Sequence, residues 1–234
     1  MDAPIIGITT SYESGEGTDS AKLSLDAGYV SAVERAGGVP LMIPAMSSME
    51  AMRVAFTKLD GLIMPGGPGI GDGLIGVLPD DLLPTAPERK QSDLCAFESA
   101  QQADLPILGI CYGMQFINAR FGGTIYGDVQ KEIGVGPHHP KRSDEELLSH
   151  GVMIESGSRL RDLVERPSDV NSYHIQAIAD VGLGLRVSIR SSDGLVEGIE
   201  SEDGRFVGVQ FHPEKMPGTV WDVLFTDLIR RCTP

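Results

Sequence analysis

The stretch that decides the fold reads Leu105-Pro-Ile-Leu-Gly-Ile110-Cys111-Tyr-Gly113-Met-Gln115. Residues 105–110 form a short apolar run, which is typical of a buried strand. A helical stretch over 112–121 follows at once and ends at Gly122-Gly123, where a left-handed backbone is tolerated. The sequence therefore predicts that Cys111 lies on a sharp turn between a strand and a helix.

Such a turn indicates a nucleophile. A residue there is exposed above the sheet, and the first helical N–H groups point at the oxyanion that forms during attack. Gly109 and Gly113 lie two residues either side of Cys111 and supply the small neighbours that the turn needs. The helix N-terminus favours the thiolate, which is the form that attacks. Cys95 and Cys232 have no such setting, and we interpret them as small buried residues.

A thiolate needs a base, and the base needs a group that orients it. The segment Gly208-Val-Gln-Phe-His212-Pro213-Glu214 follows directly after a predicted buried strand. Pro213 restricts the backbone, so that His212 and Glu214 can project toward a common site. We expect His212 to take the Cys111 proton and Glu214 to hold the imidazole tautomer. The tripeptide alone is equally compatible with a surface turn, and only its combination with Cys111 favours a catalytic triad.

The first half of the chain alternates strands with helices, which predicts an α/β fold with a parallel sheet covered on both faces. The second half is richer in strands joined by tight turns, which indicates antiparallel hairpins. We find no linker and predict one domain over 1–234. The expected strands are 5–10, 39–43, 60–64, 105–110, 152–155, 185–190, 195–200 and 205–210. The expected helices are 23–36, 49–59, 88–103, 112–121 and 219–229, with irregular segments at 68–87 and 127–150.

Composition excludes several classes of function. The chain of 234 residues has 19 Lys and Arg against 33 Asp and Glu, a formal net charge of −14, which disfavours nucleic acids and anionic membranes as partners. The N-terminus lacks a signal peptide, and no apolar run could span a bilayer. Three widely spaced cysteines fit reduced thiols, so we expect a cytoplasmic protein. His138, His139 and His150 lack a ligand pattern and are interpreted as loop residues, with no metal site expected.

At this point the chain resembles the class I glutamine amidotransferase-like superfamily. That superfamily is marked by a Gly-x-Cys-x-Gly-x-Gln turn and a distant His-x-Glu pair, here Gly109 to Gln115 and His212-Pro-Glu214. The segments 171–176 (Asn-Ser-Tyr-His-Ile-Gln) and 192–197 (Ser-Asp-Gly-Leu-Val-Glu) are similar to the γ-glutamyl-γ-aminobutyrate hydrolase-like (peptidase C26) branch. The resemblance implies a flavodoxin-like three-layer sandwich, with a mostly parallel central sheet, helices on both faces and an antiparallel C-terminal strand region.

The resemblance also implies residue roles. Cys111 would form a γ-glutamyl thioester, and the backbone N–H groups of Gly67 and Tyr112 would form the oxyanion hole. Gln115 resembles the residue that binds the glutamate part of the substrate, although a core hydrogen bond explains it nearly as well. His174 would contact the substrate or be structural. The chain departs from the branch at Tyr112, where Arg is common; Cys-Tyr-Gly-Met-Gln instead resembles the glutaminase domain of guanosine monophosphate synthetase.

Three functions compete. The leading hypothesis is cysteine-dependent hydrolysis of small γ-glutamyl amides, such as γ-glutamyl-γ-aminobutyrate, with no cofactor. The second is a glutaminase that supplies ammonia to a synthase partner, and the third is a non-catalytic binding protein on the same fold. The sequence does not fix the leaving amine. Exposed apolar residues within 74–83 are compatible with a homodimer.

Overall fold

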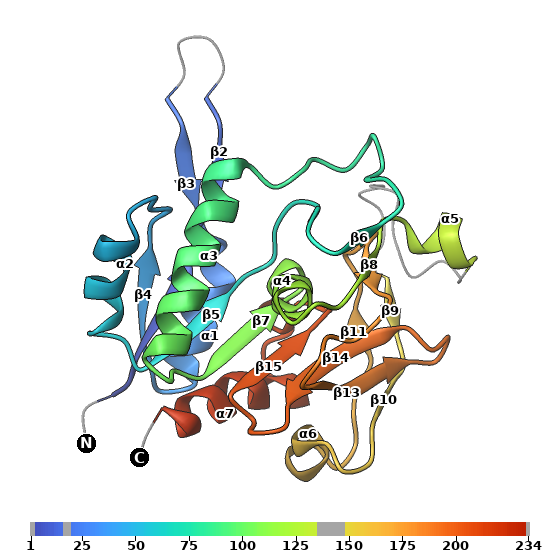
Figure 1. The fold of residues 1–234 in the computed structure, drawn as a ribbon. Coiled ribbons are helices and arrows are strands. Elements are labelled where there is room, and N and C mark those ends of the chain that lie inside the picture. Colours follow the sequence, from blue (N-terminus) through green and yellow to red (C-terminus); the bar gives the residue numbers. More distant parts are fainter. Residues whose placement is uncertain (1–2, 16–19, 135–147, 233–234) are drawn as a thin grey trace.

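The computed structural model describes residues 3–15, 20–134 and 148–232, and its elements are labelled in Figure 1. One half of the main sheet is parallel, with neighbouring strands in the order β4-β1-β5-β7-β15. Numbered along the chain, this is the 2-1-3-4-5 order of flavodoxin-like folds, which confirms the predicted fold class. These strands are β1 (Ile5–Thr9), β4 (Val39–Ile43), β5 (Gly61–Met64), β7 (Ile107–Ile110) and β15 (Phe206–Val209).

The antiparallel strands extend the same sheet beyond β15. β14 runs antiparallel to β15 and also pairs antiparallel with β13 on its other side and with the short strand β12, while β10 pairs with β13. The strand predicted at 205–210 was expected to take part only in antiparallel hairpins. As β15 it also pairs in parallel with β7, so it joins the parallel half of the sheet to the antiparallel half. The remaining strands of the sheet are β6 (Leu74–Ile75), β8 (Ile125–Tyr126), β10 (Val152–Ile154), β12 (Ala177–Ile178), β13 (Leu185–Ser191) and β14 (Val196–Ser201).

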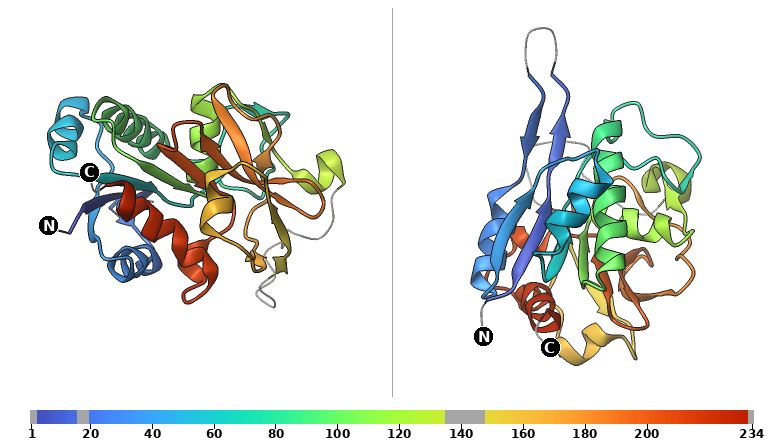
Figure 2. Two further views of the ribbon diagram at one scale, coloured as in Figure 1. Left: turned by 90° about the horizontal axis from the view of Figure 1, so that it is seen from below. Right: turned by 60° about the vertical axis from the view of Figure 1, so that its left-hand side comes forward.

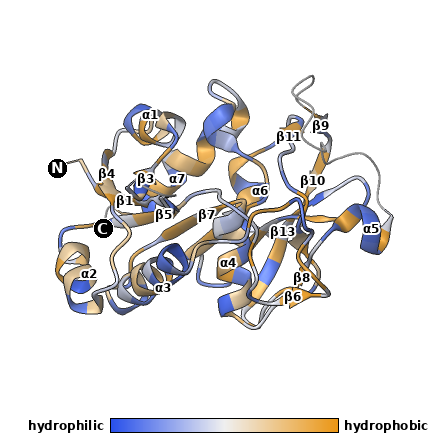
Figure 3. Cartoon of the chain, turned by 90° about the horizontal axis from the view of Figure 1, so that it is seen from above, coloured by the Kyte–Doolittle hydropathy of each residue, from blue (hydrophilic) through white to orange (hydrophobic). Residues whose placement is uncertain are grey.

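Helices cover both faces of the sheet, as Figure 2 shows. One core packs α2, α3 and α4 against the strands, and a second core on the opposite face packs α1, α6 and α7. Figure 3 shows the central strands as mainly hydrophobic and helices such as α2 and α3 as mixed, which is the pattern of helices with one buried face. The helices are α1 (Ala27–Arg35), α2 (Met49–Phe56), α3 (Pro87–Gln102), α4 (Tyr112–Arg120), α5 (Val129–Ile133), α6 (Arg159–Leu163) and α7 (Val223–Arg231).

The predicted helix over 23–36 was wrong at its start. Leu23 lies in a hairpin that pairs β2 (Ser11–Glu13) with β3 (Lys22–Ser24), opposite Tyr12. The helix begins at Ala27 because the Asp26 side chain accepts a hydrogen bond from Gly28 N at 2.7 Å and caps the first turn. A capping side chain fixes the residue at which a helix starts, and the spacing of apolar residues carries no information about it.

Other boundaries shift by smaller amounts. The segment 68–87, expected to be irregular, holds the short strand β6, which pairs with β8. The final helix starts as a 3₁₀ turn over Val220–Asp222, and a second 3₁₀ turn spans Pro213–Lys215. β9 (Ser149–His150) pairs with β11 (Val170–Asn171) in a separate two-stranded sheet. In the part of the chain that the structure describes, no helix has the length and apolar character to cross a membrane.

Candidate active site

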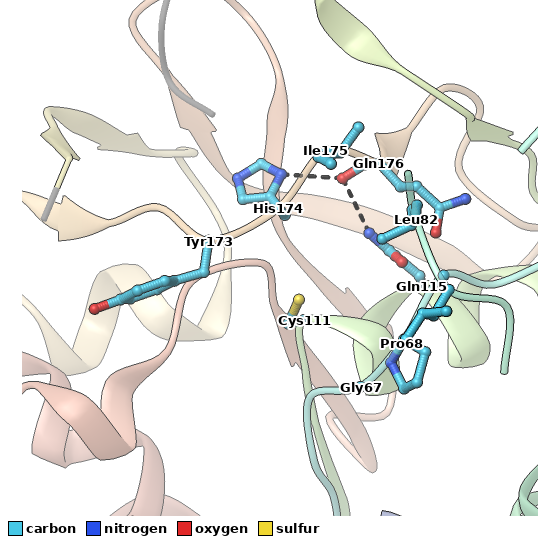
Figure 4. A pocket seen from close by; sticks show the side chains of 11 residues that line it. Gly67, Pro68, Leu82, Cys111, Gln115, Tyr173, His174, Ile175 and Gln176 are labelled. Atoms are coloured by element: carbon cyan, nitrogen blue, oxygen red, sulfur yellow. Dashed lines mark hydrogen bonds between the residues drawn. The ribbon is translucent and has the colours of Figure 1, made fainter. Parts of the chain in front are cut away.

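Cys111 lies between the last residue of β7 and the first of α4, as the sequence predicts. Its φ of +52° and ψ of −106° are a strained backbone for a residue with a side chain, a strain typical of functional positions. The turn is held because Cys111 N donates to the Val209 carbonyl at 2.8 Å and Gln115 N donates to the Cys111 carbonyl at 3.1 Å. The thiol is 7% exposed and faces the pocket of Figure 4.

The two glycines that flank Cys111 are required by close backbone approach, which confirms that the turn needs small neighbours. A Cβ at Gly109 would come within 2.7 Å of the Gly113 backbone. A Cβ at Gly113 would come within 2.0 Å of the Met64 carbonyl oxygen on β5. Both contacts involve backbone atoms, so no side-chain rotation could relieve them.

His212 and Glu214 follow β15, whose end lies beside the end of β7 because Val209 is in register with Ile110. The imidazole Nδ1 lies 2.7 Å from a Glu214 carboxylate oxygen. The backbone of His212 is fixed by Asn171, whose side chain accepts from its N–H at 2.8 Å and donates to its carbonyl at 2.9 Å. Parallel pairing thus brings Cys111 and a histidine oriented by a carboxylate to the same end of the sheet's strands.

The charge state of His212 follows from its neighbours. Burial lowers its pKa, but hydrogen bonds and charges from Cys111 and Glu214 outweigh burial and raise the pKa from 6.5 to about 10. At neutral pH the ring is therefore an imidazolium between Cys111 and Glu214.

The glycine turn after β5 lies close to His212, since a Cβ at Gly66 would come within 2.6 Å of the imidazole Cε1. Gly67 lines the pocket together with Cys111 (Figure 4). The preceding residue, Gly66, donates its N–H to the Tyr29 hydroxyl at 2.9 Å and accepts from the Arg89 guanidinium at 3.0 Å. The same guanidinium lies 4.4 Å from the ring centroid of Tyr112, the first residue of α4. The residues expected to supply two oxyanion-binding N–H groups are thus brought together around Cys111.

The pocket beside Cys111 has a volume of about 310 Å³. Its walls come from 67–69, 82–83 and 173–176, with Cys111 and Gln115 at its base. The Gln176 side chain accepts from Ile70 N at 2.7 Å and donates to Ile70 O at 2.9 Å, which fixes one side of the irregular segment 68–87. The pocket has the size of a small-molecule site and opens next to the Cys111 sulfur.

The model of the family described as peptidase C26 matches residues 4–214. The chain belongs to the peptidase C26 family. This confirms the resemblance stated from the sequence, and it assigns the protein to a family of hydrolases and glutamine amidotransferase-like enzymes.

Two relatives of this peptidase C26 protein illustrate the range. The γ-glutamyl-γ-aminobutyrate hydrolase PuuD of Escherichia coli K12 is 33% identical over 227 residues, covering 92% of this chain and 87% of its own. A Schizosaccharomyces pombe protein provisionally named a glutamine amidotransferase is 33% identical over 219 residues, covering 92% of this chain and 80% of its own. Among solved structures, a Thermoplasma acidophilum protein provisionally assigned to GMP synthase matches with a TM-score of 0.64, 19% identity and coverage of 98% and 94%, which shows the shared fold.

Gln115 and His174 of the peptidase C26 protein both line the pocket and both bond to protein groups. The Gln115 side-chain nitrogen donates to the Gln176 carbonyl at 3.0 Å and to the Gln210 side chain at 3.1 Å. The His174 Nδ1 lies 3.0 Å from the same carbonyl, and its Nε2 lies 3.5 Å from Glu197 (dashed lines in Figure 4 mark the bonds to the carbonyl). The structural interpretation of each residue thus has direct geometric support, and substrate contact stays a proposal.

His150 is not a loop residue, which corrects the expectation from the sequence. It lies in β9, is 6% exposed, and its Nε2 is 3.4 Å from a carboxylate oxygen of Glu197. Burial raises the pKa of Glu197, but the hydrogen bonds from His150 and His174 outweigh burial and lower the pKa from 4.5 to about 2. His138 and His139 lie outside the described residues. Within the described ranges, no group of three or more His, Cys, Asp or Glu is arranged to hold a metal ion.

Four residues near the site were missed by sequence reasoning: Tyr29, Arg89, Glu197 and Gln210. Gln210 donates to the Cys111 sulfur at 3.5 Å and lies inside the quoted segment before His212, so position could have identified it. Arg89 has a weaker signal, an i,i+4 pair with Asp93 on a helix that must pack against the sheet. Glu197 is the last residue of the quoted segment 192–197, although that segment does not reveal its approach to His174. No local pattern marks the approach of Tyr29.

Proposed function

We propose that this protein hydrolyses small γ-glutamyl amides, of the γ-glutamyl-γ-aminobutyrate type, through a γ-glutamyl thioester on Cys111. The observation that carries the proposal is the strained Cys111 beside an imidazolium that a buried carboxylate orients at 2.7 Å. The printed name of the Escherichia coli relative supplies the substrate class. The pocket of about 310 Å³ next to the thiol is the proposed site of the acyl group.

In the first half-reaction the Cys111 sulfur attacks the γ-carbonyl carbon, and the carbonyl oxygen becomes an oxyanion. The N–H groups of Gly67 and Tyr112 are proposed to stabilise that charge. His212 then gives its Nε2 proton to the amide nitrogen, the C–N bond breaks, and the free amine leaves. Glu214 keeps the imidazole in the orientation that this transfer requires.

In the second half-reaction the now neutral His212 takes a proton from water. The hydroxide attacks the thioester carbon, a second oxyanion forms in the same place, and the C–S bond breaks to release glutamate. The thiolate and the imidazolium are restored, so atoms and charges balance over the cycle. Gln115 and His174 are proposed to line the part of the pocket that holds the glutamate portion.

The test is release of glutamate from a panel of γ-glutamyl compounds that includes γ-glutamyl-γ-aminobutyrate and glutamine. Cys111→Ala removes the nucleophile, and Cys232→Ala is the matched control. The Cys232 sulfur lies against Gly61, the first residue of β5, at the opposite end of the strands from Cys111. We expect release by the wild type and by Cys232→Ala, and none by Cys111→Ala.

The panel separates the competing functions. Release from γ-glutamyl amides other than glutamine supports the hydrolase and identifies its leaving amine. Release from glutamine alone would replace the proposal by a glutaminase that supplies ammonia to a synthase partner. A folded wild-type protein that releases glutamate from no compound would favour a non-catalytic binding protein.

A further inference from the structure

Gly66 is held by buried side chains at both its N–H and its carbonyl, which belong to two successive peptide groups. Its N–H donates to the Tyr29 hydroxyl at 2.9 Å, and its carbonyl accepts from Nη2 of Arg89 at 3.0 Å. The Pro65 carbonyl accepts from the same nitrogen at 3.3 Å. Arg89 is 1% exposed and Tyr29 is 4% exposed, so both bonds are shielded from water.

This arrangement fixes the direction of the next N–H group. The Gly66 carbonyl and the Gly67 N–H belong to one trans peptide plane and point in opposite directions. Since the carbonyl points at Arg89, the Gly67 N–H points away from Arg89, toward the side where Gly67 lines the pocket with Cys111. Two consecutive glycines have little conformational preference of their own, so the direction depends on outside contacts.

Arg89 also touches the segment that carries the second N–H group. Its guanidinium stacks on the Tyr112 ring at 4.4 Å, is paired with Asp93 at 3.2 Å and donates to the Ser11 hydroxyl at 2.8 Å. Tyr29 links the glycine turn to the histidine, because its hydroxyl accepts from Gly66 N and also lies 3.5 Å from Nδ1 of His212. The glycine turn is therefore connected to α4 through Arg89 and to the histidine through Tyr29.

A contribution to folding stability does not explain why the ion pair between Arg89 and Asp93 is buried here. Both side chains are 1% exposed, and the desolvation of a fully buried ion pair commonly offsets its attraction. A planar guanidinium can, however, bond to two carbonyls and stack on a ring at the same time, which an apolar side chain cannot do. The contacts therefore point to a role in orientation.

We propose that Arg89 and Tyr29 are positioning residues, which clamp the backbone of Gly66 so that the N–H groups of Gly67 and Tyr112 converge on one oxyanion. The inference rests on the proposed thioester chemistry. It predicts that loss of the clamp slows acylation and leaves substrate binding and the reactivity of the thiol largely intact.

The test compares Arg89→Met and Tyr29→Phe with the matched control Arg231→Met. Arg231 is a partly buried arginine, likewise paired with an aspartate four residues away, Asp227 at 2.9 Å. It bonds to the Gly204 carbonyl in the turn before β15, away from the site. We expect kcat to fall about 10²-fold in Arg89→Met, as when an oxyanion donor is lost, with a small change in KM. Tyr29→Phe should lower kcat about tenfold, and Arg231→Met should leave it near the wild-type value.

Two further measurements separate positioning from general damage. Alkylation of Cys111 by iodoacetamide forms no oxyanion, so its rate should stay close to wild type in all three variants. Guanidinium ion added to Arg89→Ala should restore part of kcat, because it can occupy the vacated site. Wild-type kcat in folded Arg89→Met, or an alkylation rate that falls as far as kcat, would overturn the inference.

A readout without substrate keeps the two proposals distinguishable. In protein labelled with ¹⁵N-glycine, the amide signals of Gly66 and Gly67 should shift or broaden in Arg89→Met and Tyr29→Phe but not in Arg231→Met. Unchanged Gly66 and Gly67 signals in Arg89→Met would refute the clamp. If the wild type releases no glutamate while these signals change as expected, the clamp stands and only the proposed substrate class fails.

Discussion

Replacement of Gly67 by alanine is the sharpest test of the glycine turn. A Cβ at this position would lie 2.2 Å from Nη1 of Arg89 and 2.7 Å from its Cζ. The guanidinium cannot swing aside easily, because Asp93 and Ser11 hold it at 3.2 Å and 2.8 Å. To reach even the 3.0 Å limit of real Cβ contacts, the turn must move by about 0.8 Å, a shift that the backbone at Gly67 has to absorb.

The size of the effect follows from hydrogen-bond geometry. A donor is useful at about 2.7–3.1 Å from the oxyanion, and a displacement of this size takes it past 3.5 Å, where little of the bond remains. We therefore expect Gly67→Ala to act like removal of one oxyanion donor and to lower kcat about 10²–10³-fold, equivalent to about 3–4 kcal/mol. KM should change little, since ground-state contacts elsewhere in the pocket are kept.

Gly71→Ala is the matched control, because a Cβ there meets nothing within 4 Å and the residue lies in the irregular segment 68–87 that directly follows Gly67. Initial rates of glutamate release give kcat and KM for both variants, and thermal unfolding reports whether each is folded. Gly71→Ala should behave like wild type. A folded Gly67→Ala protein with wild-type kcat would refute both the close packing against Arg89 and the role of the Gly67 N–H.

Three other predictions concern stability. Cys111→Gly should be about 1 kcal/mol more stable to urea than Cys111→Ala, because glycine relieves a backbone strain of about 1–3 kcal/mol and only part is lost to unfolded-state entropy; equal stabilities would contradict this. The pKa of His212 is raised to about 10, so its stabilisation is complete below pH 6.5 and is lost as the pH rises through 10. The melting temperature should thus fall more steeply over that window in wild type than in His212→Gln, and parallel curves would count against it. Glu197→Gln should cost roughly 3 kcal/mol at pH 7 in chemical denaturation, because it leaves His150 and His174 without their carboxylate. Since the pKa of Glu197 is lowered to about 2, the difference from wild type should shrink as the pH falls from 4.5 to 2, and a constant difference would argue against the buried charge.

Local sequence patterns determined a large part of this protein. The alternation of apolar strands and helices predicts the parallel half of the sheet, because burial on two faces imposes its own periodicity. The Gly-x-Cys-x-Gly spacing predicts the turn at Cys111, because two close backbone contacts exclude side chains at Gly109 and Gly113. Both signals depend on residues within a few positions of one another, which is why one sequence suffices to read them.

Only the tertiary structure decided which distant groups meet. The in-register pairing of Val209 with Ile110 brings His212 to Cys111, and the packing of α1 and α3 brings Tyr29 and Arg89 to the glycine turn. The burial of His150 against Glu197 depends likewise on a partner far along the chain. These contacts are fixed by the free energy of the whole fold, in which strand pairing and packing override local preference, so no short stretch of sequence contains them.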